Sequence, residues 1–204
     1  MSASVRVLSG PLFFFLAALI VGAICYLVHR WRLIAGAIAG GACLVLAVFA
    51  LRQAVGETLS VLGRVWVLNR PLVILGRTWA FSPTNLAALA FVLIIAGLAF
   101  LLALPASQGW SYYAFGMGVV AALTMALTAQ QYLYSILFVW LAAVLGVFVL
   151  SGGRPGATSG ALRFVVLTSL AAMVLLTVPA FLGSGADAAG IYRARIMMVI
   201  GFGV

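Results

Sequence analysis

Side chains that can bind a metal or transfer a proton are scarce in this sequence. The chain has two acidic residues, Glu57 and Asp187, and a single histidine, His29. No carboxylate pair, metal-ligand cluster or nucleophile triad can be assembled from them, so we expect no catalytic site and no metal site in this chain. The two cysteines, Cys25 and Cys43, lie inside apolar runs, which indicates buried thiols instead of a disulfide or metal ligands.

Polar side chains next to or within apolar stretches are the remaining candidates for chemistry, because burying them in a membrane is costly and usually serves a function. The residues that we consider for a hydrated proton path are Arg163, Thr128, Gln130, Gln131, Ser135 and Thr168. The structural alternative for Arg163 is a guanidinium that reaches back to the membrane surface. The alternative for the hydroxyls and amides is helix capping or hydrogen bonding between helices.

The overall composition indicates that a lipid bilayer surrounds most of the chain. Of the 204 residues, 67% are hydrophobic and 6% are charged. A soluble domain carries about 25% charged residues and could not bury this much apolar surface. The net charge of +9 comes from arginines scattered at the ends of apolar runs and in loops. This scatter favours anchoring at the membrane interface over nucleic-acid binding.

Six apolar runs are long enough to cross the hydrocarbon core, which takes about 20 helical residues. The predicted spans are residues 11–28, 33–51, 86–104, 112–128, 132–150 and 162–182. A seventh run begins after Arg195 and reaches the last residue after nine positions. We therefore expect an N-terminal fragment of a longer protein, with a stub covered by a partner subunit as the alternative. The predicted fold class is an all-α polytopic membrane protein, with residues 1–204 in one helix bundle.

The longest connection, residues 52–85, is expected to lie outside the membrane. Residues 72–75 and 78–81 are rich in β-branched and aromatic side chains and flank Gly76, a pattern typical of a β-hairpin. The preceding stretch, residues 56–68, is predicted to form a short amphipathic helix on the membrane surface. The connection also carries four arginines, so the positive-inside rule leaves the membrane orientation ambiguous.

Five short motifs follow one another in a fixed order from Trp79 onward. They are Trp-Ala-Phe-Ser-Pro-Thr-Asn-Leu-Ala at 79–87, Tyr112-Tyr113, Leu-Phe-Val-Trp-Leu at 137–141, Arg163-Phe164, and the Gly-containing stretch 197–204. In this order, over residues 70–204, the chain resembles the proton-translocating antiporter-like membrane subunits. That family includes subunits of respiratory complex I, of Mrp-type cation/proton antiporters and of membrane-bound hydrogenases.

The resemblance implies a proton-translocating membrane subunit of an NADH-quinone oxidoreductase-like complex in the bacterial inner membrane. Such a subunit has no cofactor of its own, because the redox cofactors belong to partner subunits. The implied partners are the other membrane subunits of a redox or antiporter complex and the lipid bilayer, and they do not include nucleic acid.

The chain departs from this family at two charged positions. The family carries a glutamate directly after the tryptophan of its fifth helix, where this chain has Leu141. The lysine of the family's seventh helix would fall just past Val204. We expect Leu141 to face the bundle interior, as the glutamate would. The missing acid favours one alternative, a non-conducting structural subunit of such a complex. The other alternative is an unrelated multi-pass transporter or membrane enzyme, in which the motif order is fortuitous.

Overall fold

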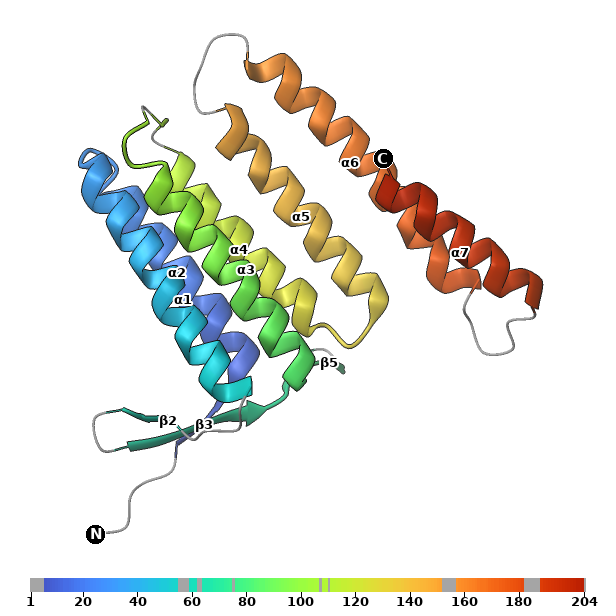
Figure 1. Ribbon diagram of the computed structural model, residues 1–204. Coiled ribbons are helices and arrows are strands. Elements are labelled where there is room, and N and C mark those ends of the chain that lie inside the picture. The colour runs from blue at the N-terminus through green and yellow to red at the C-terminus, as the bar shows by residue number, and fades with distance from the viewer. Residues whose placement is uncertain are drawn as a thin grey trace.

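Helices make up most of the protein, as the computed structural model in Figure 1 shows. The structure describes residues 6–54, 59–61, 64–74, 76–106, 108–109, 111–151, 157–181 and 188–203. The helices in these residues are α1 Gly10–Leu27, α2 Arg32–Ala54, α3 Pro83–Leu102, α4 Tyr112–Thr128, α5 Tyr132–Ser151, α6 Ala157–Phe181 and α7 Ala188–Gly203.

Five of these helices, α1, α2, α3, α5 and α6, are long and apolar enough to cross a membrane. The fourth predicted span corresponds to α4, which is apolar but has 17 residues and therefore a length of about 26 Å. Five helices that could cross a membrane agree with the prediction of a multi-pass helical membrane protein. The number of six spans remains a prediction.

Some helices begin before the apolar runs that predicted them. Helix α3 begins at Pro83, because Ser82 Oγ accepts a hydrogen bond from the Asn85 N–H at 3.1 Å and proline suits the first helical turn. Helix α7 begins at Ala188 and not after Arg195. An apolar run indicates only the part of a helix that lipid can surround. The helical backbone can extend beyond that part into neighbouring polar residues, so a helix can begin before its apolar run.

Helices α1 to α4 form a bundle with a common core (Figure 1). Phe14, Leu89, Leu93 and Met117 are at most 1% exposed in this core. Helices α2 and α3 approach closely at Gly40, where an added Cβ would lie 3.2 Å from the Gly97 carbonyl oxygen. Small residues permit such backbone contact between membrane helices.

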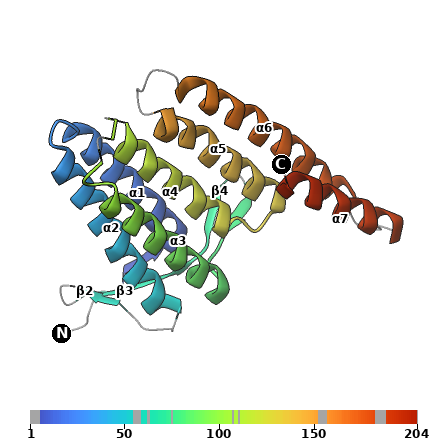
Figure 2. The same cartoon turned by 45° about the horizontal axis from the view of Figure 1, so that its top comes forward.

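Helices α5, α6 and α7 follow the bundle one after another, each packed on the preceding helix (Figures 1 and 2). The core shared by α5 and α6 is small and contains Ile136, Ala172 and Leu175. Only 11% of an apolar 18-residue stretch of α5 is buried, whereas 44% of the corresponding stretch of α2 is buried. In a membrane, lipid or neighbouring helices would cover the exposed apolar surface of α5 and α6.

The segment between α2 and α3 forms short strands beyond one end of the helices (Figure 1). Strands β4 Leu72–Ile74 and β5 Arg77–Trp79 pair antiparallel. Gly76 between them has φ +73°, a left-handed conformation that glycine adopts without strain. The predicted hairpin is confirmed.

The amphipathic helix predicted at 56–68 is wrong wherever the structure describes that stretch. Strands β2 Leu59–Val61 and β3 Arg64–Arg70 pair antiparallel there, and β1 Arg6–Ser9 pairs parallel with β3. Val65, Trp66 and Val67 are β-branched or aromatic and favour extended backbone. The remaining residues of the predicted helix lie outside the described residues.

Candidate functional site

The junction between α4 and α5 binds the β4–β5 hairpin through backbone hydrogen bonds. The Ala80 N–H donates to the Thr128 carbonyl at 2.9 Å, and the Gln130 N–H donates to the Thr78 carbonyl at 3.2 Å. The Gln130 side-chain Nε2 also donates to the Ala80 carbonyl at 3.3 Å. Two residues predicted for the proton path, Thr128 and Gln130, therefore hold the hairpin against the helices.

Aromatic packing strengthens the same junction. Trp79 is 5% exposed, and its ring meets the Tyr134 ring edge to face with the centroids 5.8 Å apart. The guanidinium carbon of Arg77 lies 5.9 Å from the Tyr134 ring centroid, within the range of a cation–π interaction. Strand β5 is thus fixed to the first turn of α5.

Four hydroxyls of the helices, two of them buried and two half-buried, donate their protons to backbone carbonyls. The pairs, 2.7 to 2.9 Å apart, are Thr124 to Val120, Thr128 to Thr124, Thr168 to Phe164, and Ser135 to Ala126. The three threonine bonds reach one turn back within their own helices. The Ser135 bond joins α5 to the last turn of α4. Each hydroxyl keeps free lone pairs that can accept a further hydrogen bond.

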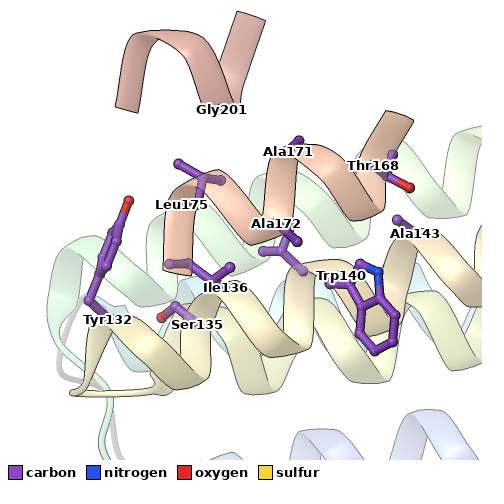
Figure 3. Close-up of a pocket in the computed structure, with 11 residues that line it drawn as sticks. Tyr132, Ser135, Ile136, Trp140, Ala143, Thr168, Ala171, Ala172, Leu175 and Gly201 are labelled. Carbon is purple, nitrogen blue, oxygen red and sulfur yellow. The ribbon is translucent and has the colours of Figure 1, made fainter. Parts of the chain in front are cut away.

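A cavity of about 260 Å³ lies between α5, α6 and α7. Figure 3 shows Tyr132 and Ser135 on α5, Thr168 on α6 and Gly201 on α7 around it. The rest of the lining is apolar, apart from the indole of Trp140. A cavity of this volume has room for several water molecules, which occupy about 30 Å³ each in the liquid. The structure therefore brings together two of the predicted path residues, Ser135 and Thr168.

Arg163 lies away from this cavity. Trp140 Nε1 donates to Ser169 Oγ at 3.0 Å, which places these residues at one level of the antiparallel helices α5 and α6 (Figure 1). Counted from that level, Ser135 and Arg163 lie in opposite directions, about 16 Å apart along the bundle at 1.5 Å per residue. Around α6, Arg163 and Thr168 are about 140° apart. Arg163 is therefore not in a continuous path with the cavity hydroxyls.

The expectation that Leu141 faces the bundle interior is wrong. Leu141 is 40% exposed, whereas the adjacent Ala142 is 4% exposed. The two buried residues of α5 are Ile136 and Ala142. Leu141 is about 100° around the helix from Ala142 and about 140° from Ile136, so it lies on another face. This orientation counts against equating Leu141 with the glutamate of the family.

Gln131 belongs to the start of α5. Its carbonyl accepts hydrogen bonds from the N–H groups of Tyr134 at 3.1 Å and Ser135 at 3.3 Å. These bonds form the first turn of the helix, so the backbone of Gln131 has a structural role. Tyr132, Trp140 and Gly201 line the cavity but were not predicted. For Tyr132 the reason is that an aromatic residue at a span end is equally typical of an interface anchor.

The part of the chain that the structure describes contains no acidic side chain, since Glu57 and Asp187 both lie outside it. Within the same part, no group of three His, Cys, Asp or Glu residues could hold a metal ion. What the cavity offers is therefore hydrogen bonding by the hydroxyls of Ser135 and Thr168 and by the phenol of Tyr132.

Comparison with protein-family models finds no match, and neither curated proteins nor solved structures give a significant match. The likeness to antiporter-like subunits consequently depends on the motif order in the sequence.

Proposed function

We propose that this chain is a proton-translocating membrane subunit of an NADH-quinone oxidoreductase-like complex. The cavity between α5, α6 and α7 carries the proposal, because it collects the hydroxyl groups of Ser135, Thr168 and Tyr132 in an otherwise mostly apolar lining. The motif order from Trp79 onward supports the same class. Polar groups at membrane depth are costly and usually belong to a transport path.

In this role the cavity hydroxyls would hold a chain of water molecules, and protons would move along the hydrogen bonds of that chain. The Ser135 and Thr168 hydroxyls can accept hydrogen bonds from water through their free lone pairs, and to donate in turn each would have to release its backbone carbonyl. Hydroxyls do not titrate near neutral pH, so the acids and bases that load and release protons would come from neighbouring subunits. Arg163 holds its proton too tightly to act as a carrier, and would bias the local potential instead.

The test is proton pumping by the native complex. The chain carries an affinity tag, and the complex is purified from membranes in mild detergent and reconstituted into liposomes. A pH-sensitive dye then reports proton uptake during NADH-driven quinone reduction. Thr168→Val and Ser135→Ala are expected to lower the ratio of protons moved to electrons transferred. Thr177→Val is the matched control, because Thr177 also donates to a carbonyl of its own helix, at 2.7 Å, but lies outside the cavity lining.

A tagged complex without redox or antiporter subunits would refute the proposal, and so would an unchanged ratio in both cavity variants. The chain alone, purified and reconstituted, is expected to give no proton flux above the lipid background. Clear flux from the isolated chain would point to an independent transporter.

The second hypothesis is a non-conducting structural subunit of such a complex. The specific observation in its favour is that the hydroxyls of Thr128, Ser135 and Thr168 are already bonded to backbone carbonyls. The outward position of Leu141 favours it too. This hypothesis predicts unchanged pumping in the cavity variants, together with loss of assembled complex when the hairpin junction is disrupted.

A further inference from the structure

Helix α6 contains a proline, Pro179, near its C-terminal end. Thr168 and Leu175, which both line the cavity between α5, α6 and α7, are seven residues apart and therefore lie on one face of α6. Pro179 follows Leu175 by four residues, so it lies on the same face one turn further on. Proline has no backbone N–H. The Leu175 carbonyl therefore lacks the donor that a helix normally supplies four residues later, although α6 continues to Phe181.

The freed Leu175 carbonyl lies on the side of α6 that faces α7. A Cβ added to Gly201 of α7 would lie 3.3 Å from the Ala171 carbonyl oxygen and 2.6 Å from Leu175 Cγ. Ala171 and Leu175 are one turn apart, so the same face of α6 approaches α7 at both residues. A helical carbonyl lies on the same side of the axis as its own Cα. The cavity is on this side of α6, and a carbonyl left unbonded in such an apolar place needs a donor.

Two hydroxyls of α5 lie near the level of this carbonyl. The hydrogen bond from Trp140 to Ser169 fixes a common level of the antiparallel helices α5 and α6. From that level toward the hairpin end of the helices, Ser135 lies about 7.5 Å away, Leu175 about 9 Å and Tyr132 about 12 Å, at 1.5 Å per residue. Figure 3 shows the Tyr132 side chain pointing away from α5 toward the side where α6 and α7 lie. Its hydroxyl forms no hydrogen bond to any residue that the structure describes.

We propose that the Leu175 carbonyl, the Tyr132 hydroxyl and the Ser135 hydroxyl bind one ordered water molecule at the hairpin end of the cavity. The water donates one hydrogen bond to the Leu175 carbonyl and one to Ser135 Oγ, whose own proton is used on the Ala126 carbonyl. It accepts the third from Tyr132, which gives it the usual number of partners of a buried water, about three. Pro179 is a positioning residue, because it keeps the carbonyl free. The inference rests on the proposed function for the role of this water, as the first member of the water chain.

The experiment is hydroxyl-radical footprinting of the purified full chain in lipid nanodiscs. A short X-ray pulse converts water into hydroxyl radicals, which oxidise the side chains beside them, and mass spectrometry gives the oxidation rate of each residue. Leu175 is 6% exposed and Leu86, in the core of α1 to α4, is 7% exposed, so the two leucines are matched in burial. Leu175 is expected to be oxidised several-fold faster than Leu86, because a bound water produces the radical next to it.

Three variants test which groups hold the water. Pro179→Ala supplies the missing N–H, which bonds the Leu175 carbonyl, and the oxidation rate of Leu175 is expected to fall to that of Leu86. Tyr132→Phe removes one partner without changing the backbone and is expected to lower the rate in part. Pro83→Ala is the matched control and should change nothing, because Pro83 is in the first turn of α3, where an N–H has no acceptor within the helix.

Equal oxidation rates of Leu175 and Leu86 in the wild type would mean a dry site and would overturn the proposal. An unchanged Leu175 rate in Pro179→Ala or in Tyr132→Phe would overturn it as well. Footprinting needs no partner subunit, so its result is separate from the transport test. A fast Leu175 rate that falls in Pro179→Ala supports the water site even if the tagged complex contains no redox subunit. A dry Leu175 removes the water site even if Ser135→Ala lowers proton pumping.

Discussion

Replacing Gly40 by leucine tests whether close packing of α2 on α3 holds the N-terminal bundle together. An added Cβ at Gly40 would lie 2.7 Å from Leu101 Cγ and 3.2 Å from the Gly97 carbonyl oxygen. The Gly97 oxygen belongs to the backbone of α3 and cannot rotate away, so the two helices must move apart. Overpacking of this kind costs about 1–3 kcal/mol, and we expect a loss near the upper end because a leucine adds three further carbons beyond the Cβ.

Gly41 provides the matched control, one residue further along the same helix. An added Cβ at Gly41 meets nothing within 4 Å. Leucine also has a better helix propensity than glycine, by roughly 0.8 kcal/mol in peptides in water, so Gly41→Leu is expected to be neutral or slightly stabilising. The comparison therefore separates packing from helix propensity with the same chemical change.

The assay is equilibrium unfolding in mixed micelles, followed by far-ultraviolet circular dichroism as the fraction of denaturing detergent rises. Size-exclusion chromatography with light scattering reports the oligomeric state of each variant. The oligomeric state is expected to stay unchanged, since α3 already covers Gly40. Equal free energies of unfolding for Gly40→Leu and wild type would refute the packing argument. A change of oligomeric state at Gly40 would instead mean that this face binds a second chain.

Two further predictions concern the junctions between elements. Trp79→Ala is expected to lower the free energy of unfolding by about 3 kcal/mol, because it removes a large, almost fully buried ring of the hairpin that packs on Tyr134. Val73→Ala is the control in the same unfolding assay and should cost far less, because Val73 is 59% exposed. The Trp140–Ser169 hydrogen bond is expected to contribute about 1 kcal/mol between α5 and α6, measured by a double-mutant cycle of Trp140→Phe and Ser169→Ala. A coupling energy of zero would show that this bond does not hold α6 to α5.

The helices of this protein could be predicted from the sequence because a bilayer leaves the backbone few choices. In lipid a helix satisfies every internal N–H and carbonyl within its own segment, so a long apolar run is enough to predict one. The hairpin was also predictable, because Gly76 and its β-branched and aromatic flanks are local signals. The strands within 56–68 were missed because β3 pairs with β1, which lies more than 50 residues earlier in the chain.

Which side chains meet was decided by the tertiary structure. Apolar residues lie on all sides of α5 and α6, so the sequences of these helices carry little information about which face turns inward. Helix packing decided that Ser135 and Thr168 share a cavity, that Leu141 is more exposed than the adjacent Ala142 and that Arg163 lies outside that cavity. The sequence by itself determined that the chain belongs in a membrane, because its apolar surface is too large for water. The positions of its few polar groups depend on how the helices rotate against one another, which hydropathy does not record.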